Sequence, residues 1–184
     1  MQYRLLGLLS LIALVITACG GGESNSGDNP PPQTNNGQTV QIDGLEALES
    51  NAYFLQVDGD IQLNIVSGDM EFVPVDNVGE IILRDVASGY YLRMLIQGVP
   101  NDGTYTLLPL DQRPTPEQPV AAGLVSLTSP LDEDMYRNGV TGTVTLAYVD
   151  GNLSASFEFT AQRDDGGGTV NVRGGFKDLP LGGF

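Results

Sequence analysis

The chain has 184 residues, with 8 Lys and Arg residues against 23 Asp and Glu residues and a formal net charge of −15 at neutral pH. A chain this acidic opposes binding to phosphate backbones, which depends on clustered cations, so we expect no nucleic-acid partner. It contains no histidine, which excludes Ser-His-Asp and Cys-His catalysis and imidazole metal ligands.

Residues 1–18 have the pattern of a secretory signal peptide. Arg4 precedes an apolar stretch over residues 5–16, which is shorter than the ~20 residues that span a bilayer. The stretch ends in small residues directly before Cys19, the only cysteine of the chain. One interpretation is an ordinary signal cleaved after Ala18, which would leave an unpaired thiol in an exported protein.

The motif Ile16-Thr17-Ala18-Cys19 resembles the lipobox of bacterial lipoproteins and favours a different interpretation. The resemblance implies that the thiol of Cys19 is diacylated, that the lipoprotein signal peptidase cuts before it, and that the new amine is acylated. Two or more acyl chains attach a protein stably to a membrane. Gly20 stands where an Asp commonly retains such proteins in the inner membrane, so the resemblance implies the outer membrane, with the periplasmic or surface-exposed face left open.

Residues 19–39 are predicted to form an acylated cysteine and a flexible tether, followed by a folded domain over residues 40–184. Residues 20–39 contain no aliphatic or aromatic side chain and are rich in Gly, Ser, Asn, Pro and Gln, so they cannot build a core. Pro30, Pro31 and Pro32 stiffen one part of this segment as polyproline II.

From Val40 onward, short apolar runs with a period of two alternate with turn residues, which is typical of β-strands. Asp58-Gly59 favours a type I′ turn between two strands, and Ser88-Gly89 and Asp150-Gly151-Asn152 mark two further hairpins. The helical candidate is the short segment 44–51. Four prolines in residues 109–119 predict a long connection, since proline cannot donate to a ladder. The predicted strands cover residues 53–57, 61–66, 80–86, 90–97, 104–108, 120–128, 140–149, 153–163 and 169–176.

These eight or nine strands predict an all-β domain, because an antiparallel sheet must bury one face. We expect an antiparallel β-sandwich, with a small closed β-barrel as the alternative. The motifs Gly103-Thr104-Tyr105, Val140 to Val144, Phe157 to Ala161 and Gly175-Phe176 resemble small β-domains of unknown function in bacterial lipoproteins. That resemblance implies a fold and no catalytic residue.

The acidic run Asp132-Glu133-Asp134, followed by Asn138, supplies the hard oxygen ligands that Ca²⁺ prefers. Asp132, Asp134 and Asn138 are therefore the weak calcium candidates. As an EF-hand loop the segment fails, because Arg137 stands where a Gly is needed. Solvated turn carboxylates are the default interpretation, and apart from the covalent lipid on Cys19 we expect no cofactor.

Tyr136 lies beside Arg137 in a polar stretch, and loops on a rigid scaffold commonly carry recognition. We therefore expect Tyr136 and Arg137 to contact a partner. The sequence predicts a non-enzymatic domain, anchored to the outer membrane by its lipid, that binds an envelope protein or an extracellular ligand through its loops. Two alternatives stay open, a β-barrel that binds a small apolar ligand and a carboxylate-dependent hydrolase.

Overall fold

The computed structural model describes residues 45–99, 101–126 and 135–182, and these residues form eleven strands and no helix. In chain order the strands are β1 (Ala52–Gly59), β2 (Leu63–Ser67), β3 (Met70–Val75), β4 (Val78–Asp85), β5 (Tyr90–Gln97), β6 (Gly103–Thr106), β7 (Leu108–Pro109), β8 (Val120–Ser126), β9 (Tyr136–Val149), β10 (Asn152–Arg163) and β11 (Thr169–Pro180). The predicted all-β class is confirmed, and each predicted strand overlaps an observed one.

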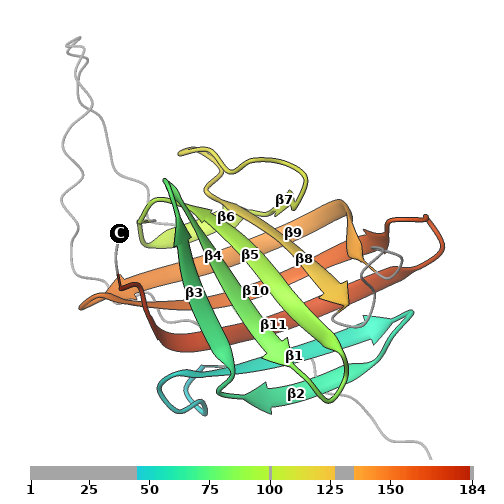
Figure 1. The fold of residues 1–184 in the computed structure, drawn as a ribbon, viewed down its shortest axis with the longest axis horizontal. Helices are drawn as coiled ribbons and strands as arrows, with labels where there is room; N and C mark the ends of the chain where they lie inside the picture. The colour runs from blue at the N-terminus through green and yellow to red at the C-terminus, as the bar shows by residue number, and fades with distance from the viewer. Residues whose placement is uncertain (1–44, 100, 127–134, 183–184) are drawn as a thin grey trace, which may run out of the picture. The chain divides into compact units, whose positions relative to one another are not determined.

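All strands belong to one sheet in the order β2-β1-β11-β10-β9-β8-β5-β4-β3, with β6 paired to β9 and β7 to β8. The sheet curls until β3, β4, β5 and β8 cross in front of β9, β10 and β11 (Figure 1). Its two edge strands, β2 and β3, follow each other in the chain around a corner at Gly68, where the Met70 amide donates to the Gly68 carbonyl at 3.0 Å. The sheet is therefore nearly closed and barrel-like.

The inside of the curled sheet is filled by apolar side chains from every long strand. Burial alternates along β10, for example. Its buried residues are Leu153, Ala155, Phe157, Phe159 and Ala161, and the residues between them are more exposed. These buried residues of β10 belong to one continuous cluster that also includes Tyr53, Ile81, Met94 and Phe176. The core is thus built by the period-two pattern that predicted the strands.

The hairpins follow the predicted turns with one exception. Asp150 and Gly151 both have positive φ values, 51° and 85°, in a two-residue turn between β9 and β10, as a type I′ turn requires. The predicted tight turn at Asp58-Gly59 is wrong. Both residues stay in β1 and pair with β11, with Gly59 opposite Val170, and the chain turns only after them.

The prediction missed β3 and covered only Leu108 of β7, and each of these strands contains a proline. Pro74 lies in β3, an edge strand, where a missing amide donor is tolerated. Pro109 lies in the two-residue strand β7, which pairs in parallel with Ala121 and Ala122 of β8. The proline-rich connection also brings Leu110 against Gly123, so that β8 is buried on both faces.

The predicted helical segment 44–51 is not a helix over the residues described from Leu45 onward. It forms turns, with the Leu48 amide donating to the Leu45 carbonyl at 3.1 Å. Leu45 and Leu48 pack outside the main core against Phe54. A Cβ at Gly175 would lie 2.6 Å from Leu45, so glycine there makes room for this contact. Tertiary packing therefore replaces the helical hydrogen bonds that the spacing of the leucines favoured.

Candidate functional site

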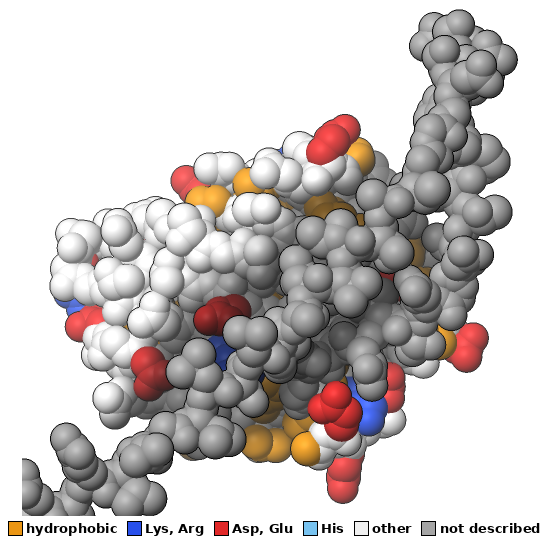
Figure 2. All heavy atoms as spheres, turned by 180° about the vertical axis from the view of Figure 1, so that it is seen from behind, with side chains coloured by type: hydrophobic (Ala, Val, Ile, Leu, Met, Phe, Trp, Pro, Cys, Tyr) orange, Lys and Arg blue, Asp and Glu red, His pale blue; other side chains and the backbone are white. Residues whose placement is uncertain are grey.

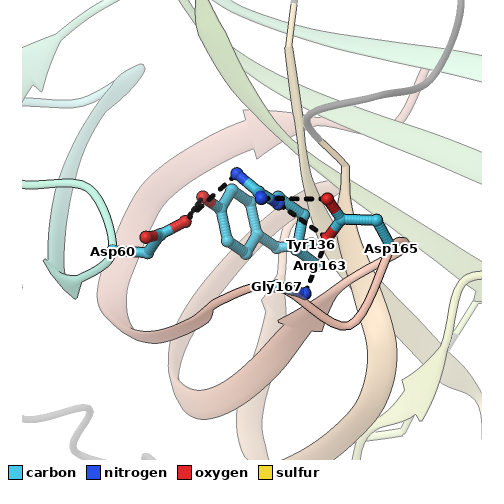
Figure 3. A network of polar contacts seen from close by, with 5 residues as sticks. All are labelled: Asp60, Tyr136, Arg163, Asp165 and Gly167. Atoms are coloured by element: carbon cyan, nitrogen blue, oxygen red, sulfur yellow. Dashed lines mark hydrogen bonds and ion pairs between the residues drawn. The ribbon is translucent and has the colours of Figure 1, made fainter.

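A network of polar side chains joins three segments at one end of the sheet (Figure 3). Asp60 comes from the β1–β2 loop, Tyr136 begins β9 and Arg163 ends β10. The Tyr136 hydroxyl donates to Asp60 Oδ2 at 2.5 Å, and Arg163 Nη1 lies 3.6 Å from the same oxygen. Asp60 is therefore held between a phenol and a guanidinium.

The β10–β11 turn is held by the same arginine. Arg163 donates from Nε and Nη2 to the two carboxylate oxygens of Asp165 at 2.8 and 2.9 Å, and the Gly167 amide donates to Asp165 Oδ1 at 2.7 Å. Such two-pronged contacts fix orientation as well as distance. The hydrogen bonds from Arg163 hold the pKa of Asp165 below its usual range. The β10–β11 turn keeps its contacts with Arg163 as long as Asp165 is ionised.

Tyr136 is a poor acid in this setting. Burial, and secondly the hydrogen bond to Asp60, raise the pKa of its hydroxyl well above the ordinary value. At neutral pH the phenol therefore keeps its proton and acts as a hydrogen-bond donor. The network can tie the β1–β2 loop to β9 and β10, whereas the protonated hydroxyl is not available as a base.

The prediction that Tyr136 lies in a polar loop is wrong, because the residue opens β9 with 1% of its surface exposed. The register between β9 and β10 shifts on both sides of Asn138, so the inward position of the tyrosine ring accompanies a β-bulge and does not follow from simple alternation. Arg137 points the other way and pairs with Asp164, Nε to Oδ2, at 2.7 Å, with 35% of its side chain exposed. Of the two predicted contact residues, Arg137 is the one at the surface.

The remaining predicted residues are divided between described and undescribed parts of the chain. Cys19, Asp132 and Asp134 lie outside the described residues. Asn138 lies in β9 opposite Gln162 of β10. Within residues 45–99, 101–126 and 135–182, no group of three or more His, Cys, Asp or Glu side chains is placed to hold a metal ion.

A second feature, which the sequence did not single out, is a hollow of about 510 Å³ on the outer side of β1, β11, β10 and β9. Figure 2 views the domain from behind, and on the left of that view uncharged polar side chains and backbone predominate. We call the following eight residues the polar face: Gln56, Asp58, Thr141, Thr143, Glu158, Thr160, Asn171 and Arg173. The alternation of each strand indicated outward polar positions, but their grouping depends on the pairing of the strands.

Comparison of the chain with protein-family models, with curated proteins and with solved structures finds no match. The resemblances to a lipobox and to small lipoprotein β-domains therefore stay predictions from the sequence. In the described part of the chain, no helix is long and apolar enough to cross a bilayer.

Proposed function

We propose that the protein is a non-enzymatic binding module, anchored to the outer membrane by a lipid on Cys19, that engages an envelope protein through the loops at one end of its sheet. The observation that carries this proposal is the network around Arg163. It fixes the β1–β2 loop and the β10–β11 turn through Asp60 and Asp165. Loops fixed in advance lose less conformational entropy when a partner binds.

Arg137 supplies the contact point next to these fixed loops. Its pairing with Asp164 holds a partly exposed guanidinium in a defined direction. Arginine is enriched among the residues that dominate protein interfaces, because its planar group makes several hydrogen bonds and also packs. The chain is acidic overall, so Arg137 is a local cation on it. We therefore expect a partner whose contacting surface is acidic or rich in carbonyl groups.

The two alternative functions have less support. Binding of a small apolar molecule needs interior space, whereas the described interior side chains pack into one cluster. Hydrolysis by paired carboxylates needs an acid and a base free to exchange protons, whereas the three carboxylates at the loop end, Asp60, Asp164 and Asp165, are each paired with an arginine.

Affinity isolation of the membrane-bound protein, followed by crosslinking and mass spectrometry, tests the proposal. We expect an envelope protein crosslinked near the β1–β2 and β10–β11 loops, and at least fivefold less of it with Arg137→Ala, which corresponds to about 1 kcal/mol at an interface. Arg84→Ala is the matched control, since that arginine is paired with Glu71 on β3. Failure to recover a partner, or equal recovery with both variants, contradicts the proposal.

A further inference from the structure

The polar face is built as two rows of side chains that cross four neighbouring strands. In one row Gln56 of β1, Arg173 of β11, Glu158 of β10 and Thr143 of β9 are consecutive partners. In the other row the partners are Asp58, Asn171, Thr160 and Thr141. Strand spacings of ~4.8 Å and a rise of ~3.4 Å per residue give a face about 14 Å across, with rows about 7 Å apart.

A third row extends the face in the direction of Phe54. It contains Ser156 and Thr145, and a smaller hollow of about 210 Å³ lies there, bordered by Phe54, Thr143 and Arg173. Thr143, Glu158 and Arg173 border both hollows. The outer side of these strands therefore carries a continuous shallow depression instead of a flat polar surface.

Arg173 and Glu158 are available to a ligand. They are direct cross-strand partners, yet within the described part of the chain neither forms a hydrogen bond or an ion pair. On the opposite half of the sheet, Arg84 pairs with Glu71 and Arg93 pairs with Glu80, at 3.2 and 2.6 Å. Among the described residues, Arg173 and Glu158 thus stay unpaired on the polar face, whereas these two arginines on the opposite half of the sheet each have a carboxylate partner.

The side chains of the polar face suit a ligand that carries many hydroxyl groups. The amides of Gln56 and Asn171, the Arg173 guanidinium, the Glu158 and Asp58 carboxylates and the threonine hydroxyls offer donors and acceptors side by side. Vicinal hydroxyls both donate and accept, so they can be matched by such a mixed set. Both signs of charge are present in the same row, which favours an uncharged ligand over an anion or a cation.

Other classes of ligand fit this face less well. An added peptide strand needs the unpaired backbone of a sheet edge, whereas β11 and β10 lie in the middle of the sheet with a strand on each side. A protein interface usually has an apolar or aromatic centre, which the two rows lack. Nucleic acid and anionic lipid need cations, and Arg173 is the only cation of the polar face.

We infer that the polar face is a binding site for a neutral glycan chain, which lies across β1, β11, β10 and β9 with its hydroxyls bonded to Arg173, Glu158, Asn171 and Gln56. This site is separate from the loop end to which the proposed function assigns a protein partner. Since the depression is shallow and its polar groups must be dehydrated on binding, we expect weak affinity for a single segment and stronger attachment to a polymer with many such segments.

A glycan array that carries neutral and acidic oligosaccharides, probed with the labelled full chain in detergent, tests the inference. We expect retention on at least one neutral glycan, at least tenfold weaker binding with Arg173→Ala and with Asn171→Ala, and little change when the salt concentration is raised. Arg84→Ala is the control and keeps wild-type binding. Circular dichroism of each variant establishes that the fold is kept, as expected for exposed positions.

Three results overturn the inference: no retention on any neutral glycan, retention on acidic glycans alone, or neutral binding that Arg173→Ala and Asn171→Ala leave unchanged. None of them affects the proposed protein partner, whose crosslinks are expected at the loop end and depend on Arg137. Conversely, if no crosslinked partner is recovered while the expected glycan binding is found, the proposed function alone is overturned.

Discussion

Replacement of Tyr136 by Phe removes one hydroxyl and keeps the buried ring. The hydroxyl donates to Asp60 Oδ2 at 2.5 Å from a residue that is 1% exposed. After the change, the more distant contact with Arg163 at 3.6 Å is what the Asp60 carboxylate keeps among the described side chains. The variant therefore isolates the hydrogen bond that ties the β1–β2 loop to β9.

The size of the effect follows from the charge and the exposure of the acceptor. A hydrogen bond to a charged group contributes about 1.5–3 kcal/mol to the free energy of unfolding. The Asp60 side chain is 34% exposed, so water replaces part of the lost bond and we expect the lower end, about 1.5 kcal/mol. For a domain of this size that corresponds to a fall in Tm of about 3–6 °C.

Urea unfolding of the purified full chain, followed by circular dichroism, measures this difference. Tyr148→Phe is a matched control on the same strand, because no hydrogen bond of the Tyr148 hydroxyl is found among the described residues, and we expect a change below about 0.5 kcal/mol. Tyr136→Phe in the Asp60→Asn background should cost clearly less than in the wild type. Equal losses in both backgrounds, or equal losses at Tyr136 and Tyr148, would refute the reasoning.

Three further predictions concern the core, alkaline pH and the anchor. A Cβ at Gly142 would lie 2.1 Å from the Glu158 carbonyl oxygen, so Gly142→Ala should lower the free energy of unfolding by about 3 kcal/mol, and an unchanged urea midpoint would contradict that close approach. Burial raises the pKa of Tyr53 to about 12 from an unfolded value of about 10. Because the folded state binds this proton more tightly, its contribution to the free energy of unfolding is complete below pH ~10 and is lost as the pH rises to ~12. Unfolding measured against pH should therefore show a shallower fall in Tyr53→Phe. Cys19→Ser should leave the circular dichroism spectrum unchanged and move the protein from the membrane fraction to the soluble one, and continued sedimentation with membranes would argue against the lipid anchor.

The sequence predicted strands well because burial of one face imposes a local alternation. Leu153 to Ala161 of β10 alternate without interruption, and the strand is found where the pattern places it. β3 was missed because Pro74 and adjoining apolar residues hide its alternation. Proline is tolerated there only because the strand is at an edge, and whether a strand lies at an edge is a property of the whole sheet.

The two candidate sites could not be predicted because they depend on pairings between distant segments. Tyr136 was assigned to a loop from its polar neighbours, and the register shifts that accompany its inward position arise only from the pairing of β9 with β10. Nothing local to Asp60 indicates that its partner is Tyr136, and nothing local to Arg173 indicates Glu158. A shift of one residue in either register would turn these side chains to the other face.

The lipid anchor is the central claim of the proposed function, because it places the domain at the envelope where its partner must be. Intact-mass spectrometry of the protein purified from membranes measures the anchor directly. We predict a chain that begins at Cys19 and carries the added mass of a diacylglycerol group and one further acyl chain. An unmodified chain that begins at Cys19, or a mature chain that begins at any other residue, would contradict the account.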